Sequence, residues 1–265
     1  MSNQENSSPT IRQILRKVPE ITIYFWVIKV LCTTVGETAA DFLNTQFKLG
    51  LTGTTVIMGI LLAITLFFQF KLRKYVPSIY WLAVVLISVF GTLITDNLTD
   101  NFGVSLITTT IIFSIALAMI FLAWYKVEKS LSIHTINHMR REGFYWLAIL
   151  FTFALGTAAG DLTAEKMNLG YLVSAIMFAA LIAIVTIAHL RFKLNAVLAF
   201  WVAYILTRPL GASIGDYLSQ PQDSGGLGFG TVVTSALFLA AILIIVIYLT
   251  VTKNDAVARN EEALG

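Results

Sequence analysis

The sequence has few charged residues and a single cysteine, and these shortages exclude most classes of soluble protein. Charged side chains make up 12% of the 265 residues, whereas soluble domains carry roughly 25%. Cys32 has no second cysteine with which to form an intrachain disulfide. Hydrophobic residues make up 57% of the chain, and its mean hydropathy is +0.80. This composition predicts an integral membrane protein.

Motifs that indicate an enzyme or a nucleic-acid-binding protein are also missing. The sequence contains no phosphate-binding glycine-rich loop and no Ser/His/Asp grouping, so we expect no catalytic residues and no cofactor. The net charge of +3 does not indicate a nucleic-acid partner, because the basic residues flank apolar segments. The polar start, MSNQENSSPT, lacks the pattern of a signal peptide. We expect residues 1–16 to form a disordered or amphipathic N-terminus.

Eight apolar segments have the length of about 20 residues that a membrane-spanning helix needs. They predict an all-α integral membrane protein and lie near residues 21–46, 52–70, 77–100, 105–125, 143–165, 170–190, 195–218 and 229–251. The chain divides into a first half (17–125), a polar linker (126–142), a second half (143–251) and a tail (252–265).

The distribution of basic residues predicts the orientation of the helices. Fourteen Lys and Arg residues lie at the two ends of the chain and in the loops after the second, fourth and sixth segments. The other four loops carry only Lys48 and Lys166. The positive-inside rule therefore places both termini, the linker 126–142 and the tail 252–265 in the cytoplasm.

A motif of three residue types recurs four times in a fixed frame. The segments VGETAAD (35–41), FGTLITD (90–96), LGTAAGD (155–161) and LGASIGD (210–216) each place Asp five residues after Gly. A tryptophan precedes each glycine by ten residues, at Trp26, Trp81, Trp146 and Trp201. The chain therefore consists of four repeats of two helices each, in two duplicated halves.

Each repeat crosses the membrane twice, so the first helices of all four repeats must point the same way. Such parallel repeats favour a ring of equivalent residues around one central axis. The tryptophans and the aromatic residues before them predict an aromatic belt at the inner membrane surface; the preceding residues are Phe25, Tyr80, Tyr145 and Phe200. Small residues four apart, such as Gly156 and Gly160, predict close helix packing.

Acidic residues within the apolar segments are the candidate cation ligands. An aspartate at the centre of a membrane helix costs ~2.5–3.5 kcal/mol, so four in register indicate a function or a strong network of partners. The proposed metal-binding set is Glu37, Asp41, Asp96, Asp161 and Asp216. The alternative is that these aspartates only cap helices or make hydrogen bonds near the outer helix ends.

Further polar residues accompany the acids. Their oxygen-rich side chains suit hard cations of the Mg²⁺, Ca²⁺ or Mn²⁺ class, and the candidates are Asn44, Thr92, Asp100, Thr157 and Glu165. Lys29 and Arg208 are basic residues inside apolar segments. They either neutralise part of the acidic set and gate it, or each pairs with one acid for structural reasons.

The repeat sequences resemble a known family. YWLAVVLISVFGTLITDNLTDNFG and FYWLAILFTFALGTAAGDL, with the first repeat, are similar to bacterial multi-pass proteins described as predicted membrane-anchored proteins and built from a short repeat of unknown function. The resemblance covers nearly all of residues 17–250 and implies a bacterial inner-membrane protein. It implies no activity, so the function must be inferred from the residues.

We predict a multi-pass cation transporter or channel whose ring of intramembrane aspartates binds a hard divalent metal ion. Protons are a second candidate cargo, and their displacement by the cation would make cation binding increase with pH. The first alternative is a proton-coupled exporter of an organic cation. The second is a membrane scaffold or sensor that transports nothing. The expected partners are the lipid bilayer and a small cation, and the sequence leaves oligomerisation open.

Overall fold

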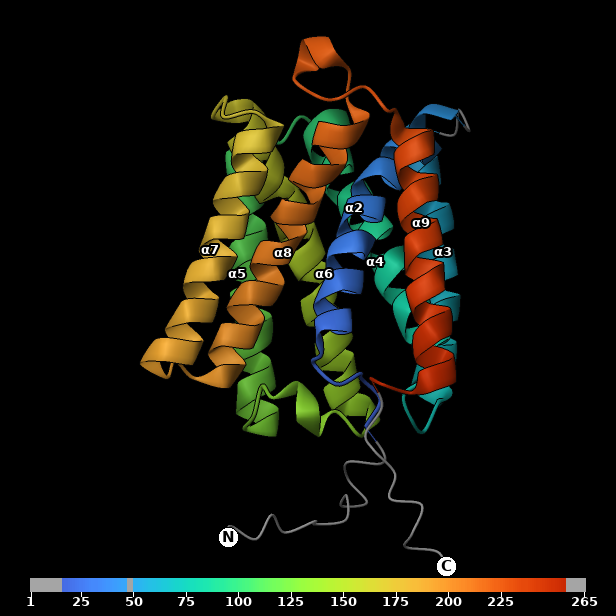
Figure 1. Cartoon of the computed structure of the whole chain (residues 1–265), viewed down its shortest axis with the longest axis vertical. Coiled ribbons are helices and arrows are strands. Elements are labelled where there is room, and N and C mark those ends of the chain that lie inside the picture. Colours follow the sequence, from blue (N-terminus) through green and yellow to red (C-terminus); the bar gives the residue numbers. More distant parts are fainter. Residues whose placement is uncertain (1–15, 47–49, 256–265) are drawn as a thin grey trace, which may run out of the picture.

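The computed structural model describes residues 16–46 and 50–255, and this part of the chain contains helices and no strand (Figure 1). Eight of the described helices are long and apolar enough to cross a membrane, which makes this a multi-pass membrane protein. Their bounds are α2 (Ile23–Gln46), α3 (Gly50–Lys71), α4 (Pro77–Asp96), α5 (Leu106–Glu128), α6 (Met139–Asp161), α7 (Tyr171–Phe192), α8 (Ala196–Ser219) and α9 (Thr231–Thr252). Four short turns connect or extend them: η1 (Asn97–Asn101), η2 (Ile133–Thr135), η3 (Leu162–Lys166) and η4 (Gln222–Ser224).

The eight predicted segments and the all-helical class are confirmed, with one notable shift at the linker. Helix α5 extends to Glu128 and α6 begins at Met139, so only ten residues separate them. Arg140 and Arg141 in the first turn of α6 donate hydrogen bonds to the carboxylate of Glu128, at 2.7 and 3.1 Å. These contacts extend both helices into the predicted linker. The predicted N-terminus 1–16 and most of the tail 252–265 lie outside the described residues.

The helices form an inner ring of four and an outer ring of four. In the membrane-spanning windows of α2, α4, α6 and α8, 56–61% of the residues are buried, against 17–28% in α3, α5, α7 and α9. The inner helices are the first helices of the four repeats, and they carry the Trp/Gly/Asp motif. The outer helices therefore provide the apolar surface that faces lipid, which explains why their sequences are almost wholly apolar.

Each outer helix packs mainly against the inner helix of the following repeat. Thus α3 packs on α4, α5 on α6 and α7 on α8, while α9, the last helix, packs on α2, the first. The hydroxyl of Ser235 in α9 donates to that of Thr38 in α2 over 2.8 Å. The four repeats therefore form a closed circle that joins the two ends of the chain.

Both ends of the described chain lie at one end of the bundle. The backbone N–H of Glu20 donates to the carbonyl of Asp255 over 2.9 Å, and Figure 1 shows that α2 begins and α9 ends at the lower end of the bundle. We call this end the terminal side, and the opposite end, where η1, η3 and η4 lie, the far side. All four inner helices run from the terminal side to the far side, so the prediction of parallel repeats is confirmed.

Seven of the eight aromatic residues of the motif are buried inside the bundle, so the prediction of a belt at the membrane surface is wrong. The side chains of Trp81, Trp146 and Trp201 are 1–4% exposed, and Trp26 is half-buried. Each aromatic residue before a tryptophan packs on the tryptophan of the next repeat, with ring centroids 5.4–6.2 Å apart: Phe25 on Trp81, Tyr80 on Trp146, Tyr145 on Trp201 and Phe200 on Trp26. These residues lie on inner helices, so their rings pack on one another and fill the centre of the bundle.

Candidate functional site

The four repeat glycines hold the inner helices in a ring. A Cβ atom on Gly36 of α2 would lie 1.7 Å from Ser88 Oγ of α4, and one on Gly211 of α8 would lie 1.7 Å from Thr33 Oγ1 of α2. A Cβ atom on Gly91 would lie 2.8 Å from Phe153 Cβ, and one on Gly156 would lie 2.2 Å from Arg208 Cγ. The partner is always the residue three before the next repeat's glycine, so only glycine permits this helix spacing.

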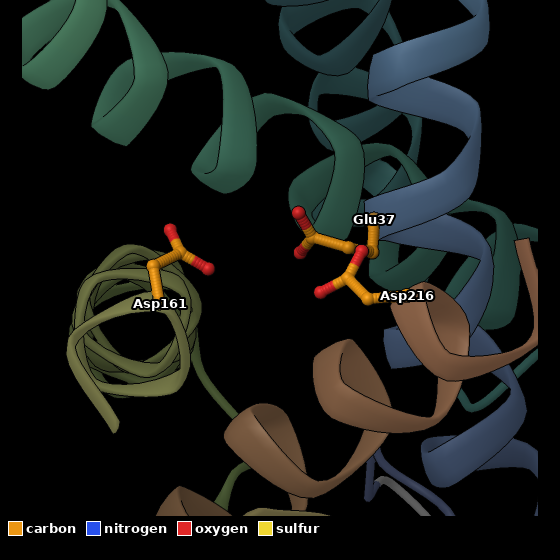
Figure 2. A group of neighbouring side chains, drawn as sticks. All are labelled: Glu37, Asp161 and Asp216. Carbon is orange, nitrogen blue, oxygen red and sulfur yellow. The ribbon is translucent and has the colours of Figure 1, made fainter. Parts of the chain in front are cut away.

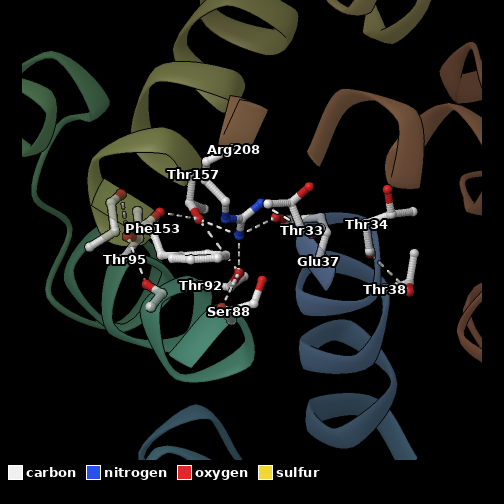
Figure 3. Close-up of polar contacts among 12 residues, drawn as sticks. Thr33, Thr34, Glu37, Thr38, Ser88, Thr92, Thr95, Phe153, Thr157 and Arg208 are labelled. Atoms are coloured by element: carbon white, nitrogen blue, oxygen red, sulfur yellow. Dashed lines mark hydrogen bonds and ion pairs between the residues drawn. The ribbon is translucent and has the colours of Figure 1, made fainter. Parts of the chain in front are cut away.

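The side chain of Arg208 crosses the centre of this ring (Figure 3). The residues directly after the four glycines are Glu37, Thr92, Thr157 and Ala212. Arg208 Nη2 donates hydrogen bonds to the three polar members, over 2.9 Å to Glu37 Oε2, over 2.7 Å to Thr157 Oγ1 and to the hydroxyl of Thr92. Its guanidinium therefore joins three of the four repeats, with its own helix as the fourth.

The Arg208–Glu37 ion pair is buried, because the two side chains are 0% and 8% exposed. Removing one partner of such a pair leaves an uncompensated charge and costs about 3–5 kcal/mol. The two threonines accept from the same nitrogen as Glu37, and the carbonyl of Thr33 accepts from Nη1 over 3.5 Å, whereas Nε has no hydrogen-bond partner among the described residues. Arg208 lies near the middle of α8, so this network fills the space between the inner helices about halfway along them.

Three acids converge beside this network, and Figure 2 shows their side chains. One carboxylate oxygen from each of Glu37, Asp161 and Asp216 lies within 4.8 Å of the others. The side chains come from α2, α6 and α8 and point toward one another. Ca²⁺ binds oxygens at about 2.3–2.6 Å, so three oxygens spread evenly around one ion lie about 4.0–4.5 Å from one another. The limit of 4.8 Å is slightly above this range, so small side-chain movements would let the three carboxylates share one hard cation.

Asp41 and Asp96, the other two repeat aspartates, are not part of this close group. Both are half-buried, and Asp96 interacts electrostatically with Glu37, Asp161 and Asp41. Asp41 accepts a hydrogen bond from Gln220 Nε2 over 3.3 Å. Packed helices lie about 8–10 Å apart, so four short aspartates cannot all meet on one axis. The longer side chain of Glu37 reaches the axis from the layer below and completes the group of three.

The remaining predicted residues lie nearer the far side. Asp100 in η1 and Glu165 in η3 are exposed, each four residues beyond a repeat aspartate, and both interact electrostatically with Asp41. The turns η1 and η3 are π-helical, a geometry that is frequent at functional sites. Asn44 is half-buried and has no hydrogen bond to any of these acids in the described chain. Exposure of the acids thus increases from Glu37 toward the far side.

Lys29 lies on the terminal side of Arg208 and is fully buried. Its Nζ lies 4.0 Å from the ring centroid of Phe153 and 4.2 Å from that of Tyr204, and has no hydrogen-bond partner among the described residues. The Phe153 ring also lies 5.6 Å from Arg208 Cζ, so the two basic groups are less than 10 Å apart. Moving an ammonium from water into the protein interior costs several kcal/mol, and a cation–π contact with each ring offsets only about 2 kcal/mol of this cost.

A second buried network lies at the terminal side, and the sequence analysis does not predict it. Lys17 Nζ donates to Glu142 Oε2 over 2.7 Å, and Gln69 Nε2 donates to Glu142 Oε1 over 3.0 Å. Glu142 is fully buried and also accepts from Trp146 Nε1 over 3.4 Å. The polar sequence before α2 and in the linker is typical of solvated loops. The local sequence does not show that other helices cover these residues.

Comparison with known proteins supports the repeat but gives no activity. Neither curated proteins nor solved structures gave a match to the chain. A family model described as Repeat of Unknown Function (DUF347) matches four times in succession, at residues 24–75, 79–130, 144–195 and 199–255. Each match spans one inner helix and the outer helix that follows it. Since the four matches cover most of the sequence, the chain belongs to the Repeat of Unknown Function (DUF347) family.

Proposed function

We propose that this membrane protein is a cation carrier that binds a hard divalent metal ion between Glu37, Asp161 and Asp216. The convergence of the three carboxylates within 4.8 Å is the observation that carries the proposal. Asp41, Asp96, Asp100 and Glu165 lie between this group and the far side, where they attract cations toward it.

The balance of charge favours a divalent ion. When ionised, the three carboxylates carry three negative charges, and Arg208 supplies one positive charge through its ion pair with Glu37. Two negative charges remain, which one divalent cation neutralises. Glu37 binds Arg208 through Oε2, so its other oxygen is available to the metal. A ligand set made only of oxygens suits Mg²⁺, Ca²⁺ and Mn²⁺ and not Cu(I).

The closed axis favours a carrier over a channel. Between the acids and the terminal side lie the guanidinium of Arg208, the side chain of Lys29 and the packed aromatic rings. A cation bound at the acids has access from the far side and is stopped by Arg208. Passage therefore needs a second conformation, as alternating access requires. With the basic loops in the cytoplasm, the far side is the outer face of a bacterial inner membrane.

Uptake of radioactive ⁵⁴Mn²⁺ into proteoliposomes tests the proposal. We expect transport by the native protein and a loss of at least tenfold in D161N/D216N. The variant D223N is the control, because Asp223 is exposed in η4, away from the acids. Competition by Mg²⁺, Ca²⁺ and an organic cation identifies the substrate. If the native protein transports none of these ions while D161N/D216N loses stability, the acids have the structural role of a scaffold.

A further inference from the structure

Lys29 is a titratable group that the proposed cation site does not use. It lies inside the membrane-spanning part of α2, is fully buried and has no hydrogen-bond partner among the described residues. Ionisable residues inside membrane helices are rare and mark ion or proton pathways. The nearest acid on the same helix, Glu37, is two turns away and is paired with Arg208.

Packing does not require a basic residue at this position. The residues that occupy the equivalent place in the other three repeats are Val84, Ile149 and Tyr204, all fully buried. Apolar or aromatic side chains therefore fill this layer in α4, α6 and α8. The charge of Lys29 is thus a property of one repeat and not a condition for forming the ring.

The groups around Lys29 act on a proton bound there. The guanidinium of Arg208, less than 10 Å away, repels an ammonium at this position. The faces of Phe153 and Tyr204, 4.0 and 4.2 Å from Nζ, favour the ammonium. The other titratable groups near Lys29 are Cys32 on the same helix and Tyr204 of α8, whereas α4 and α6 present Val84 and Ile149 to this layer. A change in the charge of the acid site beyond Arg208 therefore changes how tightly Lys29 binds a proton.

On these grounds, and resting on the proposed cation transport, we propose that Lys29 is the proton-binding site that couples release of the metal ion to uptake of a proton. Binding of H⁺ converts the Lys29 amine to an ammonium behind Arg208 and adds one positive charge to the centre of the bundle. This charge repels a cation bound at Glu37 on the other side of Arg208. Loss of the proton restores the affinity of the acids for the cation.

Several buried tyrosine hydroxyls lie on the terminal side of Lys29. The hydroxyl of Tyr204, whose ring contacts Lys29, is buried without a hydrogen-bond partner in the described chain and interacts electrostatically with Tyr145. The hydroxyls of Tyr145 and Tyr80 hydrogen-bond to each other, and the ring of Tyr80 packs on that of Tyr75 with centroids 5.6 Å apart. In the proposal, protons approach Lys29 from the side of these hydroxyls, while the cation reaches the acids from the far side.

Two transport modes in proteoliposomes test the proposal. The first is exchange of ⁵⁴Mn²⁺ for unlabelled Mn²⁺ without a pH gradient, and the second is accumulation of ⁵⁴Mn²⁺ driven by a pH gradient. We expect the rate of Mn²⁺ exchange by K29M to be within about twofold of the native rate. We expect its gradient-driven accumulation of Mn²⁺ to be at least tenfold lower than that of the native protein. D223N should perform both as the native protein does. Gradient-driven accumulation by K29M at the native level would overturn the role of Lys29.

Proton release on Mn²⁺ binding provides a measurement that does not depend on transport by K29M. In weakly buffered detergent solution, K29R should release about one proton fewer per Mn²⁺ than the native protein, because a guanidinium does not deprotonate. Equal proton release by both proteins would refute the proposal. Absence of Mn²⁺ exchange and binding in the native protein would instead refute the proposed cation transport itself.

Discussion

Gly211 of α8 lies so close to Thr33 of α2 that a Cβ atom on the glycine would fall 1.7 Å from the threonine hydroxyl oxygen. This contact joins the last repeat to the first and closes the ring of inner helices. The same ring places the guanidinium of Arg208 among Glu37, Thr92 and Thr157. The geometry of the acid site therefore depends on the glycines one layer below it.

Two glycine substitutions in α6 should have opposite effects on stability. G156A places a methyl group 2.2 Å from Arg208 Cγ and should destabilise the protein by about 1–3 kcal/mol through overpacking. G143A meets no atom within 4 Å and should stabilise it by about 0.5–1 kcal/mol, because alanine favours the helix. Thermal unfolding in detergent measures both. Equal effects of the two variants would contradict the close packing at Gly156.

The ion pair between Glu37 and Arg208 should show strong coupling in a double-mutant cycle. E37Q and R208Q should each destabilise the protein by about 3–5 kcal/mol, because each leaves a buried charge without its partner. The decrease in the free energy of unfolding of the double variant E37Q/R208Q should be clearly smaller than the sum of the decreases in the two single variants. Thermal unfolding of the three variants and the native protein measures the coupling, and additive losses would show that the pair is not formed.

Cysteine labelling should determine the orientation in the membrane. Cys32 is fully buried, so the native protein gives little background with a membrane-impermeant maleimide. His134 between α5 and α6 and Asp223 in η4 are exposed at opposite ends of the bundle. In intact bacterial cells, D223C should be labelled, and H134C should be labelled only after the membrane is permeabilised. The reverse pattern would invert the predicted orientation.

Asp255 should make stability depend on pH at the terminal side. Burial raises the pKa of Asp255 above its ordinary value, although the hydrogen bond from Tyr75 opposes this shift. The folded protein then binds a proton at Asp255 more tightly than the unfolded chain does. The free energy of unfolding therefore decreases as pH rises from the unfolded pKa of about 3.9 to the raised pKa of Asp255 in the folded protein. The midpoint of thermal unfolding of D255N should decrease less over this pH range than that of the native protein. An unchanged decline would show that other groups cause it.

Hydrophobic periodicity and spacing were sufficient to predict the eight spans, the four parallel repeats and the glycine packing. A span of about 20 apolar residues is a local property, and the Trp/Gly/Asp frame repeats the same local structure four times. The packing of α9 on α2 was not predictable in this way, because it depends on closure of the whole ring. The prediction of an aromatic belt was wrong because it, too, depends on the whole ring. A tryptophan at a given depth faces lipid if its helix is an outer one and the interior if its helix is an inner one.

The candidate site was predictable in its residue types but not in its grouping. Five acids at equivalent or neighbouring positions indicated a common interior, and Asp161 and Asp216 do converge with Glu37. The sequence could not indicate that Asp41 and Asp96 stay outside this close group, because side-chain reach and ring diameter decide it. Nor could it indicate that Arg208 pairs with Glu37 while Lys29 has no acid beside it, since both lie in apolar segments with acids on the same helix.

The most direct test of the shared cation site is to locate Mn²⁺ by its anomalous scattering in crystals of the native protein. We expect one strong peak bounded by carboxylate oxygens of Glu37, Asp161 and Asp216, and no peak at that position in crystals of D161N/D216N. A peak only beside the exposed Asp100 and Glu165, or no peak within the ring of inner helices, would contradict the account.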